Sequence, residues 1–253
     1  MADPILMVEG LVKHFGGVYA VDNVNFDIMP GEIHAVIGPN GAGKTTFVAQ
    51  LSGLLKPDAG KIIFDGRDVT TLSAPQRSHL GLARSFQITS IFKNFTALEN
   101  VVLSIQAHAG HSFRFWRPAM KDPELIGPAR KFLDEIGLGA RAEVVSSNLA
   151  HGEQRQLEIA MALATGPKLM LLDEPTAGMG PEDSDRIRDF LANLKGTYSM
   201  LLIEHDMDTV FSLADRITVL VYGKAIATGT PEEIRGNSKV RSAYLGEDEA
   251  TGA

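Results

Sequence analysis

Short apolar runs alternate along the chain with segments whose apolar residues recur every three or four positions. The runs Glu32 to Gly38, Leu169 to Asp173 and Met200 to Ile203 are each followed by such a helical pattern. Strands that alternate with helices are typical of a mostly parallel sheet with flanking helices, in which ligands bind at the carboxyl ends of the strands. The pattern therefore predicts an α/β fold.

A second pattern, with a period of two, indicates antiparallel strands. Residues 5–28 alternate apolar and polar positions around Gly16-Gly17, and residues 61–69 do so around Asp65-Gly66. Residues 219–228 predict a further hairpin around Tyr222-Gly223-Lys224. We therefore expect an antiparallel β subdomain beside the parallel sheet.

Residues 96–165 are almost wholly helical in pattern. Thr96-Ala97-Leu98-Glu99 is a capping box that opens a helix, and further on Leu125, Ala129 and Leu133 fall on one helical face with Phe132 and Ile136. The prediction is one domain, residues 1–253. Its core and antiparallel β subdomain comprise 1–90 and 166–253, and its inserted helical lobe comprises 91–165.

Composition and charge narrow the classes of function. The chain has 253 residues, 44% of them hydrophobic, and a formal charge of −7, so no global field draws it onto nucleic acid and no nucleic-acid partner is expected. Cysteine is absent, which excludes disulfides and cysteine-based metal sites. No basic and apolar leader follows Met1, and no apolar run approaches the roughly 20 residues that span a bilayer. We expect a soluble, cytoplasmic protein whose membrane role comes through partners.

A glycine-rich loop follows the first apolar run and precedes a helical pattern that starts at Thr46. It reads Gly38-Pro39-Asn40-Gly41-Ala42-Gly43-Lys44-Thr45. In such a phosphate-binding loop, backbone N–H groups and the helix N-terminus face phosphate oxygens, the lysine reaches the β- and γ-phosphates, and the Thr45 hydroxyl ligates magnesium. The loop predicts a P-loop nucleotide site.

Polar residues end three other apolar stretches. Asp173 and Glu174 end one strand, where we expect Asp173 to hold the metal and Glu174 to polarise the water that attacks the γ-phosphate. Gln87 and His205 end two more. Side chains at strand ends often serve only as caps, but Gln87 in this setting would order magnesium or water. His205 would donate to the γ-phosphate or orient Glu174.

The order of these pieces resembles the ATP-binding cassette (ABC) family over nearly the whole chain. The segment that carries this resemblance beyond the loop reads Leu149-Ala150-His151-Gly152-Glu153-Gln154, and it resembles the family's signature motif at a helix N-terminus. The resemblance implies that this segment contacts the γ-phosphate held by an opposite subunit, with ATP buried between two head-to-tail domains. It also implies that Phe15 stacks on adenine with Val21 beside it. For Phe15 the alternative is a core position.

Three positions depart from the family pattern. Ala150 and His151 stand where the family signature commonly has serine and a second glycine, and Gly180 replaces an aspartate in Ala177-Gly178-Met179-Gly180. Backbone amides must then carry more of the phosphate contact. Communication between two ATP sites is expected to be unequal or weakened.

Several stretches are similar to the ATP-binding subunits of branched-chain amino acid importers. They are Phe15-Gly16-Gly17, Ser85-Phe86-Gln87-Ile88, Glu204-His205-Asp206-Met207 and Ala243-Tyr244-Leu245-Gly246-Glu247. The resemblance implies ATP and Mg²⁺ as cofactors, and two membrane permease subunits as partners. It also implies a second ATPase subunit, in a heterodimer with a homodimer as the alternative, and indirectly an extracytoplasmic solute-binding protein. The expected location is the cytoplasmic face of the inner membrane.

Other interpretations share part of these motifs. They are an amide or urea importer ATPase, a lipopolysaccharide-export-type ATPase, a soluble cassette protein of translation or repair, and a weakly hydrolysing nucleotide-sensing module. Tandem domains or large insertions are general in the soluble cassettes, which disfavours them for this chain. The sequence of this chain does not identify the transported molecule, because selectivity resides in other chains.

The insert contains two further features. The stretch Phe113-Arg114-Phe115-Trp116-Arg117 mixes aromatic and basic residues, which suits a contact with the permease or its membrane surface; a lobe core with solvated arginines is the alternative. His108 and His111 have a helix-like spacing for a metal. Without a flanking ligand pattern, a solvated loop is favoured there.

Overall fold

The computed structural model describes residues 3–84, 91–108 and 119–248, and the side chains of these except those of residues 108 and 244–248. Contacts divide the chain into two compact units. Unit 1 comprises Met1–Leu82, Lys168–Glu174 and Leu194–Ala253, and unit 2 comprises Ala83–Pro167 and Pro175–Asn193. The expected functional division into a core and a lobe at residues 91–165 stays a prediction.

The predicted antiparallel sheet is present in unit 1. Its strands are β1 (Leu6–Phe15), β2 (Val18–Ile28), β4 (Ala59–Phe64) and β5 (Arg67–Asp68), in the order β2-β1-β4-β5. The predicted turn at Asp65-Gly66 joins β4 to β5 with φ angles of 49° and 72°. Two consecutive positive φ values match the strand twist of a two-residue hairpin, which explains a glycine at its second position.

The second sheet confirms the predicted α/β core. Its strands are β3 (Ile33–Ile37), β6 (Leu82–Arg84), β7 (Leu169–Asp173), β8 (Ser199–Ile203), β9 (Arg216–Val221) and β10 (Lys224–Gly229), in the order β10-β9-β3-β8-β7-β6. β3 pairs in parallel with β8 and β9, and β7 with β8, whereas β10 runs antiparallel to β9. Every residue of β3, β7 and β8 is buried, as is typical of strands covered on both faces.

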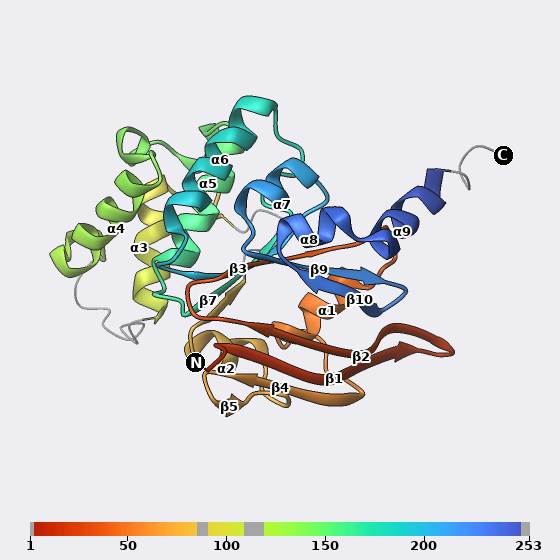
Figure 1. Cartoon of the computed structure of the whole chain (residues 1–253). Helices are drawn as coiled ribbons and strands as arrows, with labels where there is room; N and C mark the ends of the chain where they lie inside the picture. The colour runs from red at the N-terminus through yellow and green to blue at the C-terminus, as the bar shows by residue number, and fades with distance from the viewer. Residues whose placement is uncertain (1–2, 85–90, 109–118, 249–253) are drawn as a thin grey trace. The chain divides into compact units, whose positions relative to one another are not determined.

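The helices of unit 1 cover these sheets (Figure 1). They are α1 (Lys44–Leu51), α2 (Ala74–His79), α7 (Met207–Leu213), α8 (Pro231–Gly236) and α9 (Ser238–Asp248). α1 lies between the two sheets, where Phe47, Val48 and Leu51 join one hydrophobic cluster with residues of β1, β4 and β7. α8 begins at a capping box, since the Glu233 N–H donates to Thr230 Oγ1 at 3.3 Å.

Unit 2 contains α3 (Ala97–His108), α4 (Pro123–Glu135), α5 (His151–Leu163) and α6 (Pro181–Leu194, whose last residue is counted in unit 1). Short 3₁₀ turns lie at Ala119–Lys121, Gly139–Arg141 and Ser146–Asn148. The capping box at α3 is confirmed, because the Glu99 N–H donates to Thr96 Oγ1 at 3.1 Å and the Thr96 N–H donates to Glu99 Oε2 at 2.7 Å. In the part of the chain that the structure describes, no helix combines the length and apolarity needed to cross a bilayer.

The buried side chain of Arg77 fastens the far end of α1. Its Nη1 donates to the carbonyl oxygens of Gln50 and Leu51, both at 2.7 Å, while Nη2 and Nε donate to Thr70 O and Leu72 O. Burial lowers the pKa of Arg77 to about 10, so the side chain stays charged near neutral pH. A cation at the carbonyl end of a helix complements the helix dipole.

Replacing Arg77 by methionine is expected to lower the free energy of unfolding by about 2 to 4 kcal/mol, because several buried carbonyls lose their donor. Urea unfolding measures the loss. Arg67→Met, at an exposed position of β5, is the control. A change in the Arg77 variant no larger than in this control would show that the carbonyls find other donors.

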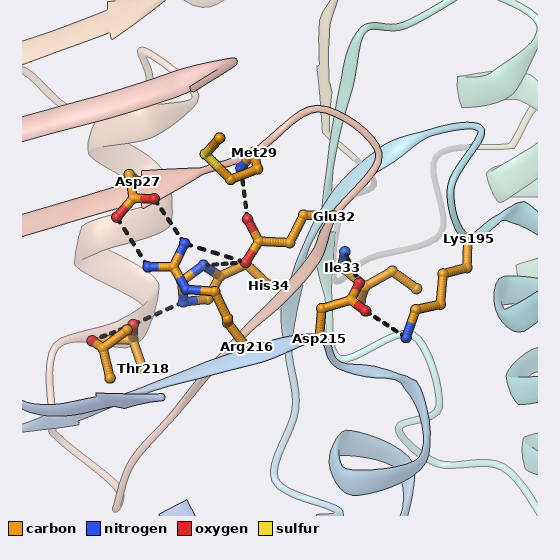
Figure 2. A network of polar contacts seen from close by, with 10 residues as sticks. Asp27, Met29, Glu32, Ile33, His34, Lys195, Asp215, Arg216 and Thr218 are labelled. Atoms are coloured by element: carbon orange, nitrogen blue, oxygen red, sulfur yellow. Dashed lines mark hydrogen bonds and ion pairs between the residues drawn. The ribbon is translucent and has the colours of Figure 1, made fainter. Parts of the chain in front are cut away.

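A polar cluster ties the beginnings of β3 and β9 to the end of β2 (Figure 2). The fully buried His34 has Nε2 2.8 Å from Thr218 Oγ1 and Nδ1 3.2 Å from Glu32 Oε1. Arg216 donates to both carboxylate oxygens of Asp27, at 2.7 and 3.1 Å, and this bond lowers the pKa of Asp27. The cluster fixes the first residues of β3, the strand whose other end leads into the glycine-rich loop.

Candidate nucleotide-binding site

The glycine-rich loop joins the carboxyl end of β3 to the first residue of α1, as predicted. A cavity of about 220 Å³ opens over it, lined by Ala20, Asn40, Gly41, Ala42, Gly43, Lys44, Thr45, Thr46 and Glu174. Lys44 Nζ donates to Gly38 O at 2.5 Å and to Pro39 O at 3.0 Å, so the ammonium group lies within the curve of the loop. The structure thus brings residues 40–46 and Glu174 together at one concave surface.

Two glycines of the loop touch neighbouring strands directly. A Cβ atom on Gly43 would lie 2.0 Å from Ala20 O of β2, and one on Gly38 would lie 2.1 Å from Leu220 O of β9. Gly43 also has a φ of 101°, a backbone conformation that residues with a side chain rarely adopt. The loop keeps its curve only because glycine occupies both positions.

The two predicted carboxylates end β7. The Asp173 side chain is buried, while Glu174 has a φ of 48° and donates its N–H to Ile203 O at 2.8 Å. A left-handed backbone is costly for a residue other than glycine, and such strain gathers at functional sites. Glu174 lines the cavity over the loop.

His205 lies beside Glu174. Its Nδ1 is 3.8 Å from Glu174 Oε1 and 3.9 Å from Oε2 of the buried Glu204. The first separation suits an ion pair and exceeds a hydrogen bond, so a small movement would let His205 orient Glu174. The two predicted roles of His205 both stay open. Gln87, the third predicted catalytic residue, lies outside the described residues, as do His111 and Phe113–Arg117.

The types of donor fit a magnesium ion that is shared with a nucleotide. Thr45 supplies a hydroxyl at the cavity, and Asp173 supplies a carboxylate at the end of β7, outside the residues that line the cavity. Within residues 3–84, 91–108 and 119–248, no group of three histidine, aspartate or glutamate side chains forms a cation cage. Mg²⁺ is typically held by one or two protein groups, water and phosphate oxygens, so this sparse donor set is the expected one.

The two residues predicted to contact adenine both lie in the β1–β2 hairpin, but only one of them is exposed. Phe15 is 55% exposed, with Lys13 Nζ 5.5 Å from its ring centroid, so it is not a core residue. Val21 is 1% exposed and belongs to the hydrophobic core cluster. The neighbouring Ala20 lines the cavity instead, a residue that sequence reasoning missed. Lys13 pairs with Val21 and His14 with Tyr19, so Ala20 is an extra residue in a β-bulge and departs from the simple alternation of the strand.

Phe15→Ala is expected to weaken ATP binding by about 0.5 to 1.5 kcal/mol, the range for loss of an aromatic stack. Thermal stability should change little, because the ring is exposed. Calorimetric titration with ATP measures the affinity, and Tyr19→Ala, at a comparably exposed position of the same hairpin, is the control. Equal affinities in the two variants would refute the stacking role.

The signature-like segment opens α5 in unit 2. Leu149 is buried, Ala150 is the N-cap residue, and Glu153 Oε2 accepts the Ala150 N–H at 2.9 Å. Alanine has no side-chain oxygen, so only this half of a capping box exists. Arg141 Nε donates to Glu153 Oε1 at 2.9 Å and lowers the pKa of Glu153. Glu153 therefore serves its own helix, and its predicted contact with nucleotide stays untested.

The first turn of α5 packs against the start of α6. A Cβ atom on Gly152 would lie 2.7 Å from Asp183 Cγ, so a larger residue here would require the Asp183 side chain to move. His151, beside it, is exposed. Gly180 precedes α6 and accepts the Ser184 N–H at 3.0 Å.

A glycine-rich loop between a buried strand and a helix, with carboxylates at the end of another strand of the same sheet, defines a P-loop nucleotide-binding protein. The sequence profile of the family described as "ABC transporter" matches residues 21–177, and that described as "Branched-chain amino acid ATP-binding cassette transporter" matches residues 226–250. The chain belongs to the ABC transporter family.

Individual relatives are similar to this chain in sequence over nearly its whole length. LivG of Escherichia coli (strain K12) and BraF of Pseudomonas aeruginosa, each described as a "High-affinity branched-chain amino acid transport ATP-binding protein", are both 40% identical over 98% of this chain and 100% of their own. A crystal structure of a nucleotide-free ATP-binding cassette from an ABC transporter has a TM-score of 0.84 and 32% identity, covering 96% of this chain and 99% of its own.

The ADP conformation of MJ1267, an ATP-binding cassette of an ABC transporter, has a TM-score of 0.85 and 30% identity, covering 97% of this chain and 100% of its own. The fold is therefore that of an ABC ATPase, and the protein is a nucleotide-binding ATPase of this family.

Proposed function

We propose that this chain is the ATP-hydrolysing subunit of an ABC importer for branched-chain amino acids. The observation that carries the proposal is the 40% identity along the full length of LivG and BraF. The profile match at residues 226–250 supports branched-chain amino acid import over amide, urea or lipopolysaccharide transport. No substrate pocket of its own is required, because the subunit supplies energy.

The cavity lining, with Asp173 at the end of β7 and His205 beside Glu174, supports a separate role for each residue. Loop amides and Lys44 bind the phosphates, while Thr45 and Asp173 would hold Mg²⁺. When bound, Mg²⁺ neutralises phosphate charge as the terminal bond breaks. Glu174 accepts a proton from the attacking water at its carboxylate, and His205 holds that carboxylate in place or donates to the γ-phosphate.

The proposal implies that this chain works in an assembly with other proteins. They are two membrane permease subunits, a second ATPase whose signature faces this chain's loop, and indirectly an extracytoplasmic solute-binding protein. The working location is the cytoplasmic face of the inner membrane.

Reconstitution in liposomes tests the proposal. The chain is assembled with its permeases, a second ATPase and the binding protein, and phosphate release is followed with leucine, isoleucine, valine, urea or acetamide. Stimulation by the three amino acids alone is expected. Stimulation by urea or acetamide would move the assignment to another importer, and no stimulation by any solute would favour a nucleotide-sensing module.

Ala150→Ser is expected to act on the opposite ATP site. A serine hydroxyl completes the cap of α5, which stabilises that helix by about 0.5 to 2 kcal/mol, and adds a donor toward the partner-held γ-phosphate. Turnover at that site should rise by up to about 10-fold, the worth of one charged hydrogen bond of modest strength. The measurement uses assemblies with one catalytic glutamate inactivated at a time. Ala150→Val, which adds bulk without a hydroxyl, is the control, and equal turnover in both variants would exclude a phosphate contact.

A further inference from the structure

The hairpin between β9 and β10 turns at Tyr222-Gly223, directly beside the phosphate loop. The two residues have φ angles of 47° and 77°, and Val221 pairs with Lys224 across the turn. The Tyr222 side chain is 85% exposed. The same turn occurs at Asp65-Gly66, where the φ angles are 49° and 72°. Both are two-residue turns of the kind that needs positive φ at both positions.

Gly223 uses both of its backbone polar groups on other segments. Its N–H donates to Ala42 O in the phosphate loop at 2.9 Å, and its carbonyl accepts the Asp22 N–H of β2 at 2.8 Å. Lys224 adds an ion pair with Asp22 at 3.2 Å. One residue therefore joins the loop that holds phosphates to the strand that continues into the Phe15 hairpin.

The bond to Ala42 O controls a donor on the other side of the same peptide unit. The described peptide bonds are trans, so the carbonyl of Ala42 and the N–H of Gly43 point in opposite directions from one rigid plane. Gly223 holds that carbonyl from outside the loop, while Gly43 lines the cavity inside it. Fixing the carbonyl thus aims the Gly43 N–H into the cavity.

The junction leaves no room for this peptide to rotate freely. A Cβ atom on Gly43 would lie 2.0 Å from Ala20 O and 3.5 Å from Gly223 Cα. The loop, β2 and the turn are therefore in van der Waals contact at this point. A displacement of Gly223 moves either the loop peptide or Ala20.

We propose that Gly223 is a positioning residue for nucleotide binding, which orients the Ala42–Gly43 peptide so that its N–H meets a phosphate oxygen. The proposal rests on the nucleotide-binding role of the loop. Gly223 acts through the peptide and contributes no side chain of its own. Its effect is on affinity for phosphates, separate from its part in the hairpin.

Gly223→Ala tests the proposal against a matched control. At Gly223 a methyl group meets Ala20 O at 3.0 Å and Tyr19 O at 3.2 Å, whereas at Gly66 it meets nothing within 4 Å. Both substitutions strain a left-handed backbone equally, so Gly66→Ala reproduces the cost in the turn without touching the loop. Calorimetric titration with ADP and thermal melting are measured for both variants.

We expect Gly223→Ala to raise the Kd for ADP by roughly 10- to 100-fold, as for one misdirected hydrogen bond to a charged group, with Gly66→Ala within about twofold of the unmodified chain. Both melting temperatures should fall, that of Gly223→Ala further, because its methyl group also meets Ala20 O. In the assembled importer, the KM for ATP should rise while turnover at saturating ATP is kept. Tyr222→Asn, which keeps the backbone turn, should bind ADP with unchanged affinity.

A Kd for Gly223→Ala within about threefold of that of Gly66→Ala would overturn the proposal. If Gly223→Ala does not fold, Gly223→Asn replaces it, because asparagine tolerates the left-handed region while its Cβ still presses on Ala20 O. Failure of the unmodified chain to bind ADP would instead refute the nucleotide role of the loop. The two failures are therefore distinct.

Discussion

Glu174→Gln is expected to slow ATP hydrolysis by about 10²- to 10⁴-fold while ATP still binds, because a glutamine amide keeps the shape of the carboxylate and cannot accept a proton. Glu174 lines the cavity over the loop, held in a left-handed conformation by its N–H bond to Ile203 O. The substitution leaves that backbone bond intact. Single-turnover hydrolysis and ATP binding on the purified variant measure the two effects separately.

The matched control is Glu182→Gln, on the exposed first turn of α6. It removes the same charge eight residues further along the chain, at a position that does not line the cavity, and should leave hydrolysis unchanged. Near-normal single-turnover hydrolysis in Glu174→Gln would remove Glu174 from the role of general base. A loss of ATP binding together with hydrolysis would show that the carboxylate holds the nucleotide instead.

Lys44→Ala is expected to abolish productive ATP binding, with a Kd raised by about 100-fold or more, because two phosphates lose a half-buried cationic partner. Lys44 Nζ now donates to the carbonyl oxygens of Gly38 and Pro39 inside the loop, within the space that phosphate oxygens would enter. Equilibrium binding of ATP measures the loss. Lys56→Ala, at an exposed position after α1, is the control, and similar Kd values in the two variants would contradict the assignment.

Local signals in the sequence predicted the parts of the site that one short segment contains. The loop from Gly38 to Thr45 is recognisable because its glycine spacing is itself the requirement for a curved backbone. The cap at Thr96 and the turns at Asp65 and Tyr222 are predictable for the same reason. In each case the residues that determine the structure are adjacent in the chain.

Local sequence signals do not predict contacts between segments that are distant in the chain. The bond from Gly223 to Ala42 joins residues far apart in the sequence, and the buried position of Arg77 depends on α1 and α2 packing together. Register shifts in the β1–β2 pair near Lys13 break the simple alternation, so counting from Phe15 does not reveal that Ala20 rather than Val21 faces the loop. Strand pairing decides these positions.

ATP-driven uptake of radiolabelled leucine into proteoliposomes tests most directly whether hydrolysis at this chain's loop energises import. The assembly contains the permeases, the binding protein and the second ATPase, with this chain either unmodified or carrying Glu174→Gln. The account predicts uptake that requires ATP and the unmodified chain, and a loss of uptake in the variant despite bound ATP. Leucine uptake that continues without this chain, or that is unchanged by Glu174→Gln, would contradict it.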